Sequence, residues 1–244
     1  MWKLFFLRFA IAAAAVLFAA AGVNLFVDSY DMYGGARIAG FTATPYKSEG
    51  TERMTKPVQM NGRLIETLIL GNSKADFACD PAVWRELTGE QHVYDAALRD
   101  ARLGESRILL EHAIKTHPEL HRVLLAIDYE LFRDDRRVQR EFDEKQSESS
   151  YITPANFAKT LFSQDALRDS LLTVRENHRE ASDAPVYSPD GKFSEASLAY
   201  IFGQEDDFYK NLHALLREQR SFVQKDRSVP YEELAAIRDL CAAN

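Results

Sequence analysis

The sequence predicts an α/β protein in which an N-terminal transmembrane helix precedes a three-layer domain built on a parallel sheet. Two observations carry this prediction. Residues 9–27 form a long and almost purely apolar run, and shorter apolar runs at 64–70, 92–95 and 122–128 alternate with helical segments, as βαβ units do. We expect an anchor at 1–27, a juxtamembrane lead-in at 28–62, and an α/β domain at 63–244 whose C-terminal part is helical.

The anchor is predicted from length and flanking charge. Between residues 9 and 27 the only polar side chain is Asn24, and 19 residues of helix span ~28 Å, close to the ~30 Å of a hydrocarbon core. Lys3 and Arg8 precede the run and Asp28 follows it, so the positive-inside rule predicts a cytoplasmic N-terminus. We expect a single-pass protein of a bacterial-type inner membrane with its bulk outside the cytoplasm. The alternative is a cleaved signal peptide with an alanine-rich cleavage region.

Composition restricts the partners of the remaining domain, which is long enough for one hydrophobic core. The net charge of −7 argues against nucleic acid, because phosphate binding needs a basic face. Cys79 and Cys241 are too few for a disulfide framework, although they could pair in an oxidising compartment. No organic cofactor is implied.

The lead-in and the predicted sheet differ in pattern. Residues 28–62 hold scattered glycine and proline without periodicity, which predicts irregular structure. The first strand, 64–70, is followed by a short helix that Asp80-Pro81 opens and Gly89 closes. A weaker strand at 92–95, a helix at 105–117 and an apolar strand at 122–128 complete a βαβαβ pattern, which predicts right-handed crossovers.

The second half of the chain reads as helical. Residues 133–150 are highly charged and predict a solvated loop or lid. The helices and loop expected after it are a helix from Thr153-Pro154, its continuation over 165–180, a loop at 182–192, a long amphipathic helix at 205–224, and a last helix from Pro230 through 231–241.

The candidate site is the turn Gly71-Asn72-Ser73, which directly follows the first predicted strand. Open α/β sheets bind ligands at the C-terminal edge of their strands. A nucleophilic serine needs such an exposed position fixed by the backbone, whereas a structural serine would simply cap the next segment.

These residues resemble the SGNH (GDSL-type) hydrolase superfamily. The similarity lies in Gly71-Asn72-Ser73 after the first strand, the βαβ unit, and the strand ending Ala126-Ile127-Asp128. It covers residues 20–132 and is closest to the membrane-anchored branch that acylates or deacylates exopolysaccharides and teichoic acids. The resemblance implies a flavodoxin-like sheet, a serine nucleophile and an extracytoplasmic site.

The resemblance assigns roles residue by residue. Ser73 takes the position of the nucleophile, and its backbone amide would donate to the oxyanion. Ala97 or Gly104 occupies the neighbourhood of the second donor, and both stay open. Asp128 stands near the place of a donor asparagine, but an ionised carboxylate cannot donate, so it could instead cap a loop or contact substrate hydroxyls.

The general base of the family is missing. The family closes with Asp-x-x-His, and none of the six histidines has an aspartate three residues before it. His178 and His213 could approach Ser73 from helices, and Lys74 is a weaker alternative base. We therefore expect a chain that lacks the C-terminal part of the family's domain, or a diverged member without the triad.

Other polar residues near the predicted strand ends have simpler readings. Asp76 and Asp80 are expected to cap the following helix. Asp95 and Asp128 could bind a metal, but they lack clustered histidine or cysteine ligands, so no metal site is predicted. Arg99 and Arg102 could face an anionic polysaccharide or simply lie in solvent.

The sequence thus favours a membrane-anchored esterase or O-acyltransferase acting on acylated cell-surface polysaccharide. The alternative is a truncated or degenerate, non-catalytic membrane protein that binds glycan or belongs to an assembly complex.

Overall fold

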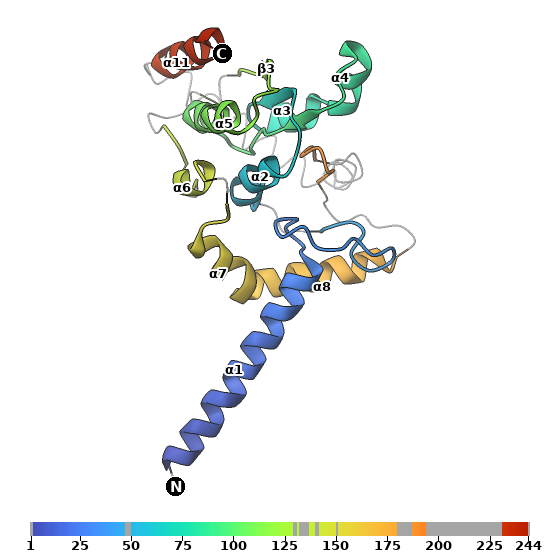
Figure 1. The fold of residues 1–244 in the computed structure, drawn as a ribbon, viewed down its shortest axis with the longest axis vertical. Coiled ribbons are helices and arrows are strands. Elements are labelled where there is room, and N and C mark those ends of the chain that lie inside the picture. Colours follow the sequence, from blue (N-terminus) through green and yellow to red (C-terminus); the bar gives the residue numbers. More distant parts are fainter. Residues whose placement is uncertain are drawn as a thin grey trace, which may run out of the picture. The chain divides into compact units, whose positions relative to one another are not determined.

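A computed structural model describes residues 2–46, 50–128, 131, 137–139, 142–149, 151–179, 187–193 and 231–243 (Figure 1). The chain divides into two compact units. We call Met1–Thr51 with Ile152–Val186 the anchor unit, and Glu52–Tyr151 with Tyr187–Asn244 the sheet unit. This division differs from the predicted boundaries, because helices that were assigned to the α/β domain pack instead on the N-terminal helix.

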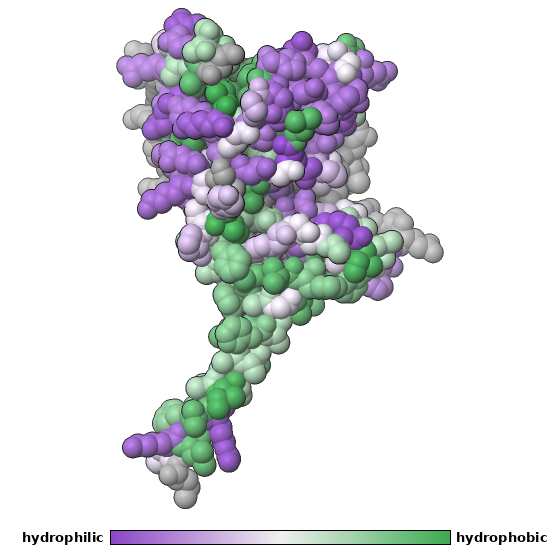
Figure 2. All heavy atoms as spheres, viewed as in Figure 1, coloured by the Kyte–Doolittle hydropathy of each residue, from purple (hydrophilic) through white to green (hydrophobic). Residues whose placement is uncertain are grey.

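The anchor unit is built on α1 (Trp2–Val27), the helix predicted from the apolar run. It is long and apolar enough to cross a membrane by length and composition, and almost all of its side chains are exposed (Figure 2). Its C-terminal end packs against α7 (Pro154–Phe162) and α8 (Gln164–Asn177). Thr153 and Ser163 cap these two helices by accepting the N–H groups of Asn156 and Ala166.

Residues 28–46 are irregular, as predicted, and are held by local hydrogen bonds. The carboxylate of Asp28 accepts the backbone N–H groups of Met32, Tyr33 and Gly35. Helix α2 (Glu52–Asn61), however, was not predicted. Pro57 and the surrounding charges hide its pattern, because most of its buried positions are polar.

The sheet unit contains three parallel strands in the order β2-β1-β3. They are β1 (Thr67–Leu70), β2 (Val93–Asp95) and β3 (Arg122–Leu125), and each is shorter than its predicted run. Leu68 of β1 lies opposite Tyr94 of β2 and Val123 of β3. The predicted class, a mixed α/β protein with a parallel sheet and an N-terminal apolar helix, is confirmed at that level.

The helices of the sheet unit follow local signals. Helix α3 (Ser73–Ala78) follows β1, and α4 (Pro81–Thr88) begins after Asp80 and ends at Gly89 in the left-handed conformation, as predicted. The longer α5 (Leu103–Thr116) connects β2 to β3. Helices α6 (Glu144–Ser147) and α11 (Tyr231–Ala243) complete the described part, and the predicted helix at 205–224 lies outside it.

The hydrophobic core belongs to the sheet unit. Leu68 and Leu70 of β1 are buried with Ile108 and Leu109 of α5 and with Ile237 of α11. Helix α11 also contacts α5 through Arg107 and Glu233, whose side chains are 2.5 Å apart. The core therefore fixes β1, and β1 in turn fixes the turn that carries Ser73.

Candidate functional site

The turn after β1 is held by close packing. Gly71 has a φ of +148°, and a Cβ there would lie 2.7 Å from the Cβ of Ala75 and 2.9 Å from the carbonyl oxygen of Ala126. The next residue, Asn72, caps α3 by accepting the N–H of Lys74 at 3.0 Å. Ser73 is then the first residue of α3 and is half-buried. Strand, turn and helix therefore fix the backbone of Ser73.

Asp128 lies beside this turn. Its carboxylate accepts the side-chain amide of Asn72 at 2.8 Å, and Lys74 Nζ lies 2.5 Å from its other oxygen. Partial burial would raise the pKa of Asp128, but the hydrogen bonds from Lys74 and Asn72 outweigh it and lower that pKa. Asp128 is therefore an ionised acceptor at neutral pH and cannot donate to an oxyanion.

The structure places the two candidates for the second oxyanion donor in other roles. The N–H of Ala97 donates to the carboxylate of Asp95 at 2.8 Å, so it is already engaged. Gly104 lies inside α5, where a Cβ would approach the backbone oxygen of Arg137 to 2.3 Å. Gly104 therefore allows Arg137 to pack closely against α5, and it does not lie at the end of β2.

The described histidines have partners other than Ser73. His112 lies 2.7 Å from the side-chain oxygen of Asn61, and burial lowers its pKa. The rings of His121 and His178 contact Glu90 and Phe41, respectively. His178 belongs to the anchor unit, and His213 lies outside the described residues. Within the described ranges, no histidine hydrogen-bonds to Ser73.

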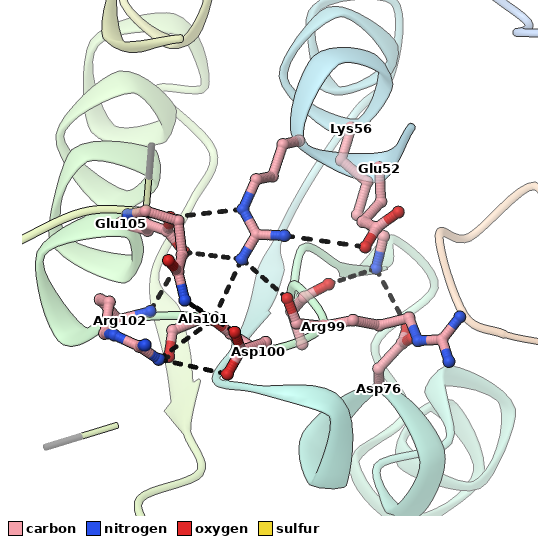
Figure 3. A network of polar contacts seen from close by, with 11 residues as sticks. Glu52, Lys56, Asp76, Arg99, Asp100, Ala101, Arg102 and Glu105 are labelled. Carbon is pink, nitrogen blue, oxygen red and sulfur yellow. Dashed lines mark hydrogen bonds and ion pairs between the residues drawn. The ribbon is translucent and has the colours of Figure 1, made fainter. Parts of the chain in front are cut away.

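A buried ionic network lies one turn beyond Ser73, and sequence reasoning missed it (Figure 3). Lys56 of α2 is fully buried. Its Nζ donates to Asp76 of α3 at 3.1 Å and to the carbonyl of Ala97 at 2.5 Å, and it lies 3.8 Å from Asp95. One ammonium group thus links α2, α3 and the C-terminal end of β2.

One carboxylate of this network, that of Asp95, has a pKa close to neutral pH. Burial, helped by Asp76 and opposed by Lys56, raises the pKa of Asp95 to about 7. Burial alone would lower the pKa of Lys56, but the charges of Asp76 and Asp95 outweigh it and raise that pKa. Asp76 therefore pairs with a charged Lys56, while Asp95 takes up a proton near pH 7.

Arg53 extends the network to the loop after β2. Its guanidinium contacts both carboxylate oxygens of Glu105 at 3.3 Å and donates to the backbone oxygens of Arg99 and Asp100. Glu105 also accepts the N–H of Arg102 at 3.1 Å, so α2 and α5 hold this loop from both sides.

The two loop arginines differ from the expectation that they face substrate or solvent. Arg102 is buried and pairs with Asp100 at 3.2 Å, so both readings were wrong for it. Arg99 is half-buried, with its guanidinium 5.5 Å from the ring centre of Phe193 and 6.0 Å from that of Phe77. Both arginines therefore take part in packing the loop.

The remaining candidate residues are local. Asp80 caps α4 and pairs with Lys192 at 2.5 Å. Cys79 is half-buried and Cys241 is exposed, and both are free thiols. In the described segments no three histidine, cysteine or acidic residues are close enough to hold a metal ion.

Comparisons with known proteins add no relatives. No protein-family model matches the sequence, and searches of curated proteins and of solved structures found no significant similarity.

Proposed function

We propose that this protein is a membrane-anchored serine esterase or O-acyltransferase of SGNH-like fold that acts outside the cytoplasm on O-acylated cell-surface polysaccharide. The observation that supports it is the position of Ser73, which follows β1 after the constrained Gly71 and begins α3. Parallel sheets carry their reactive side chains at this edge. Asn72 and Asp128 lie next to the serine and are joined by a hydrogen bond.

In the proposed reaction the Oγ of Ser73 attacks the carbonyl carbon of an ester and forms an acyl-enzyme, releasing the sugar hydroxyl. The backbone N–H of Ser73, at the start of α3 and without an intrahelical acceptor, would stabilise the oxyanion. Water then releases the acid, or a second sugar hydroxyl accepts the acyl group. The polar side chains at 72 and 128 would contact the hydroxyls of the polysaccharide.

A non-catalytic role in glycan binding or in an assembly complex is the second candidate, and specific contacts favour it. Ala97 has its N–H engaged by Asp95, Asp128 is an acceptor, and in the described part of the chain no histidine contacts Ser73. In this interpretation the polar side chains at 72–74 and 128 bind a polysaccharide without hydrolysing or transferring its acyl groups.

Ester hydrolysis by the full chain in detergent separates the two candidates. We expect hydrolysis of p-nitrophenyl acetate by the native chain and none by Ser73→Ala. Ser188→Ala is the matched control, because Ser188 is also half-buried in the sheet unit and its described contacts are through the backbone. No turnover from a folded chain, together with saturable binding of O-acetylated alginate, would instead support the non-catalytic role.

The proposal also includes the orientation of α1 across the membrane. Lys3 and Arg8 would lie at the cytoplasmic end of α1, and the sheet unit would lie outside the cytoplasm. Protease added to intact spheroplasts should then digest epitopes in the sheet unit. Protection of those epitopes until the membrane is broken would reverse the orientation.

A further inference from the structure

Helix α8 buries mostly polar side chains and exposes Leu171 beside the polar Gln164, Asp165, Arg168 and Arg175. Its buried positions are Ala166, Asp169, Ser170, Thr173 and Glu176, of which only the first is apolar. Leu171 is 60% exposed, and Leu167 and Leu172 beside it are half-buried. A helix on the surface of a water-soluble domain shows the opposite arrangement.

Helix α7 repeats this inversion. Its buried residues include Asn156 and Thr160, and the hydroxyl of Thr160 donates to the carbonyl of Asn156 at 2.9 Å. Phe157 and Phe162 are instead 42% and 45% exposed. Two consecutive helices therefore present their largest apolar side chains outward and satisfy their polar groups inside.

The turn between the two helices lies beside the apolar run of α1. The rings of Phe162 and Phe18 meet edge to face with centroids 6.3 Å apart. Asn24 fixes this corner, because its amide donates to the carbonyl of Leu161 at 2.8 Å and accepts the hydroxyl of Ser170 at 2.9 Å. Phe18 precedes the last residue of α1 by nine positions, or about 13 Å along the axis. Phe162 therefore lies at the level of the apolar segment and not at its end.

Basic residues border the outward leucines of α8. Arg168 and Arg175 are seven positions apart, so they share one face of the helix, and both are exposed. Together with Leu171 and Leu172 they line a shallow groove of about 450 Å³. Arg175 also pairs with Glu176 at 2.6 Å. Apolar side chains bordered by arginine are typical of helices that lie in a membrane interface, where guanidinium groups meet lipid phosphates.

From this arrangement we infer that α7 and α8 form a lipid-contacting surface, embedded in the leaflet that surrounds the C-terminal half of α1. Phe157, Phe162 and Leu171 contact acyl chains, and Arg168 and Arg175 bind phospholipid phosphates. The occupant is the bilayer that α1 crosses, because the apolar surface of α1 continues onto the two helices where they meet it (Figure 2). The inference is independent of the reaction proposed for Ser73.

Depth-dependent quenching tests this surface in the full chain. Single cysteines at Phe162 and Leu171, in a Cys79→Ser, Cys241→Ser background, would carry an environment-sensitive fluorophore in vesicles of phosphatidylcholine and phosphatidylglycerol. The matched control is Leu87→Cys on α4, since Leu87 is 76% exposed but belongs to the sheet unit. We expect spin-labelled lipids to quench the labels at 162 and 171 several-fold more than the label at 87.

Equal quenching at all three positions would overturn the inference. Disulfide cross-linking between chains through Leu171→Cys, without lipid quenching, would also overturn it and would assign the face to a second copy. Phe157→Cys provides an independent label if the substitution at Phe162 disturbs folding. Replacing Arg168 and Arg175 by glutamine should weaken quenching at 171 more in vesicles with phosphatidylglycerol than in phosphatidylcholine alone.

Discussion

Among the described residues, the sheet unit buries mainly apolar side chains, whereas buried polar side chains outnumber buried apolar ones in the anchor unit. The sheet unit encloses an apolar cluster around Leu68, Leu70 and Ile108, as expected of a domain folded by the hydrophobic effect. The anchor unit encloses hydrogen-bonded polar groups, among them Asn24 and Thr173, and exposes phenylalanine and leucine. A buried residue in this protein is therefore not necessarily an apolar one. Which face of a helix turns inward depends on what surrounds the unit.

The interior of the sheet unit also holds buried charges, and the ion pair of Lys56 with Asp76 is expected to matter most for its stability. Lys56→Met removes the ammonium that pairs with Asp76 and leaves that carboxylate buried without its cation. We expect a loss of about 3–5 kcal/mol in the free energy of unfolding. Denaturant titration in detergent, followed by the fluorescence of Trp84 in a Trp2→Phe background, measures it in the sheet unit.

Lys115→Met is the control for this loss, because Lys115 is exposed on α5 and should change stability little. A change below about 1 kcal/mol for Lys56→Met would show that the buried carboxylate of Asp76 does not depend on this ammonium group.

Replacing one leucine by alanine in each unit should have very different effects on stability. Leu68→Ala removes a fully buried side chain from β1 and should cost about 2–5 kcal/mol. Leu171→Ala removes an outward side chain from α8 and should change the unfolding free energy in detergent by no more than about 0.5 kcal/mol. Circular dichroism during denaturant titration follows both variants. A large loss for Leu171→Ala would mean that this leucine packs inside the folded chain.

Asn24→Leu tests the polar interior of the anchor unit. In an apolar core this change would be neutral or stabilising. Here it leaves the carbonyl of Leu161 and the hydroxyl of Ser170 without their partner, so we expect a loss of about 1–3 kcal/mol. Thermal unfolding in detergent, followed by circular dichroism, shows whether Asn24→Leu lowers or raises Tm. Val23→Leu on the exposed face of α1 is the control, and a rise in Tm for Asn24→Leu would contradict the inverted interior.

The stability of the sheet unit is also expected to depend on pH through Asp95. The pKa of Asp95 is about 7 in the folded chain and near its ordinary value of 3.8 when unfolded. The folded state therefore holds the proton more tightly. The contribution of Asp95 to stability is complete below about pH 4 and is lost as the pH rises through 7.

Asp95→Asn should flatten the decline in Tm between pH 5 and 8 that this proton causes, because an amide oxygen can still accept the N–H of Ala97. Thermal melts across this range, with the exposed Asp239→Asn as control, measure the slope. An unchanged slope in Asp95→Asn would show that Asp95 is ionised throughout.

Sequence reasoning succeeded where the determinants are local. Asp80, Pro81 and Gly89 predicted α4 closely because capping and left-handed glycine act within one turn. The apolar runs predicted three parallel strands, although each predicted strand was longer than the one in the structure. The turn at Ser73 was also placed after β1 as predicted, because a strand and the glycine after it lie next to each other in sequence.

It failed where distant segments decide the environment. Glu52, Arg53 and Lys56 look like solvated charges until Asp76, Asp95 and Glu105 are brought around them. Helices α7 and α8 could not be assigned to α1, because more than a hundred residues separate Asn24 from its partners Leu161 and Ser170. The role of Ser73 stays a prediction.

The discontinuous anchor unit imposes an order on biosynthesis. Asn24 emerges from the ribosome early, but its partners Leu161 and Ser170 lie 137 and 146 residues further along the chain. At a translation rate of ~5–20 residues per second, this interval lasts roughly 7–30 s. During that time the amide of Asn24 has neither partner. A nascent chain interrupted before Leu161 would therefore carry an amide in its apolar helix without the two partners that it has in the folded protein.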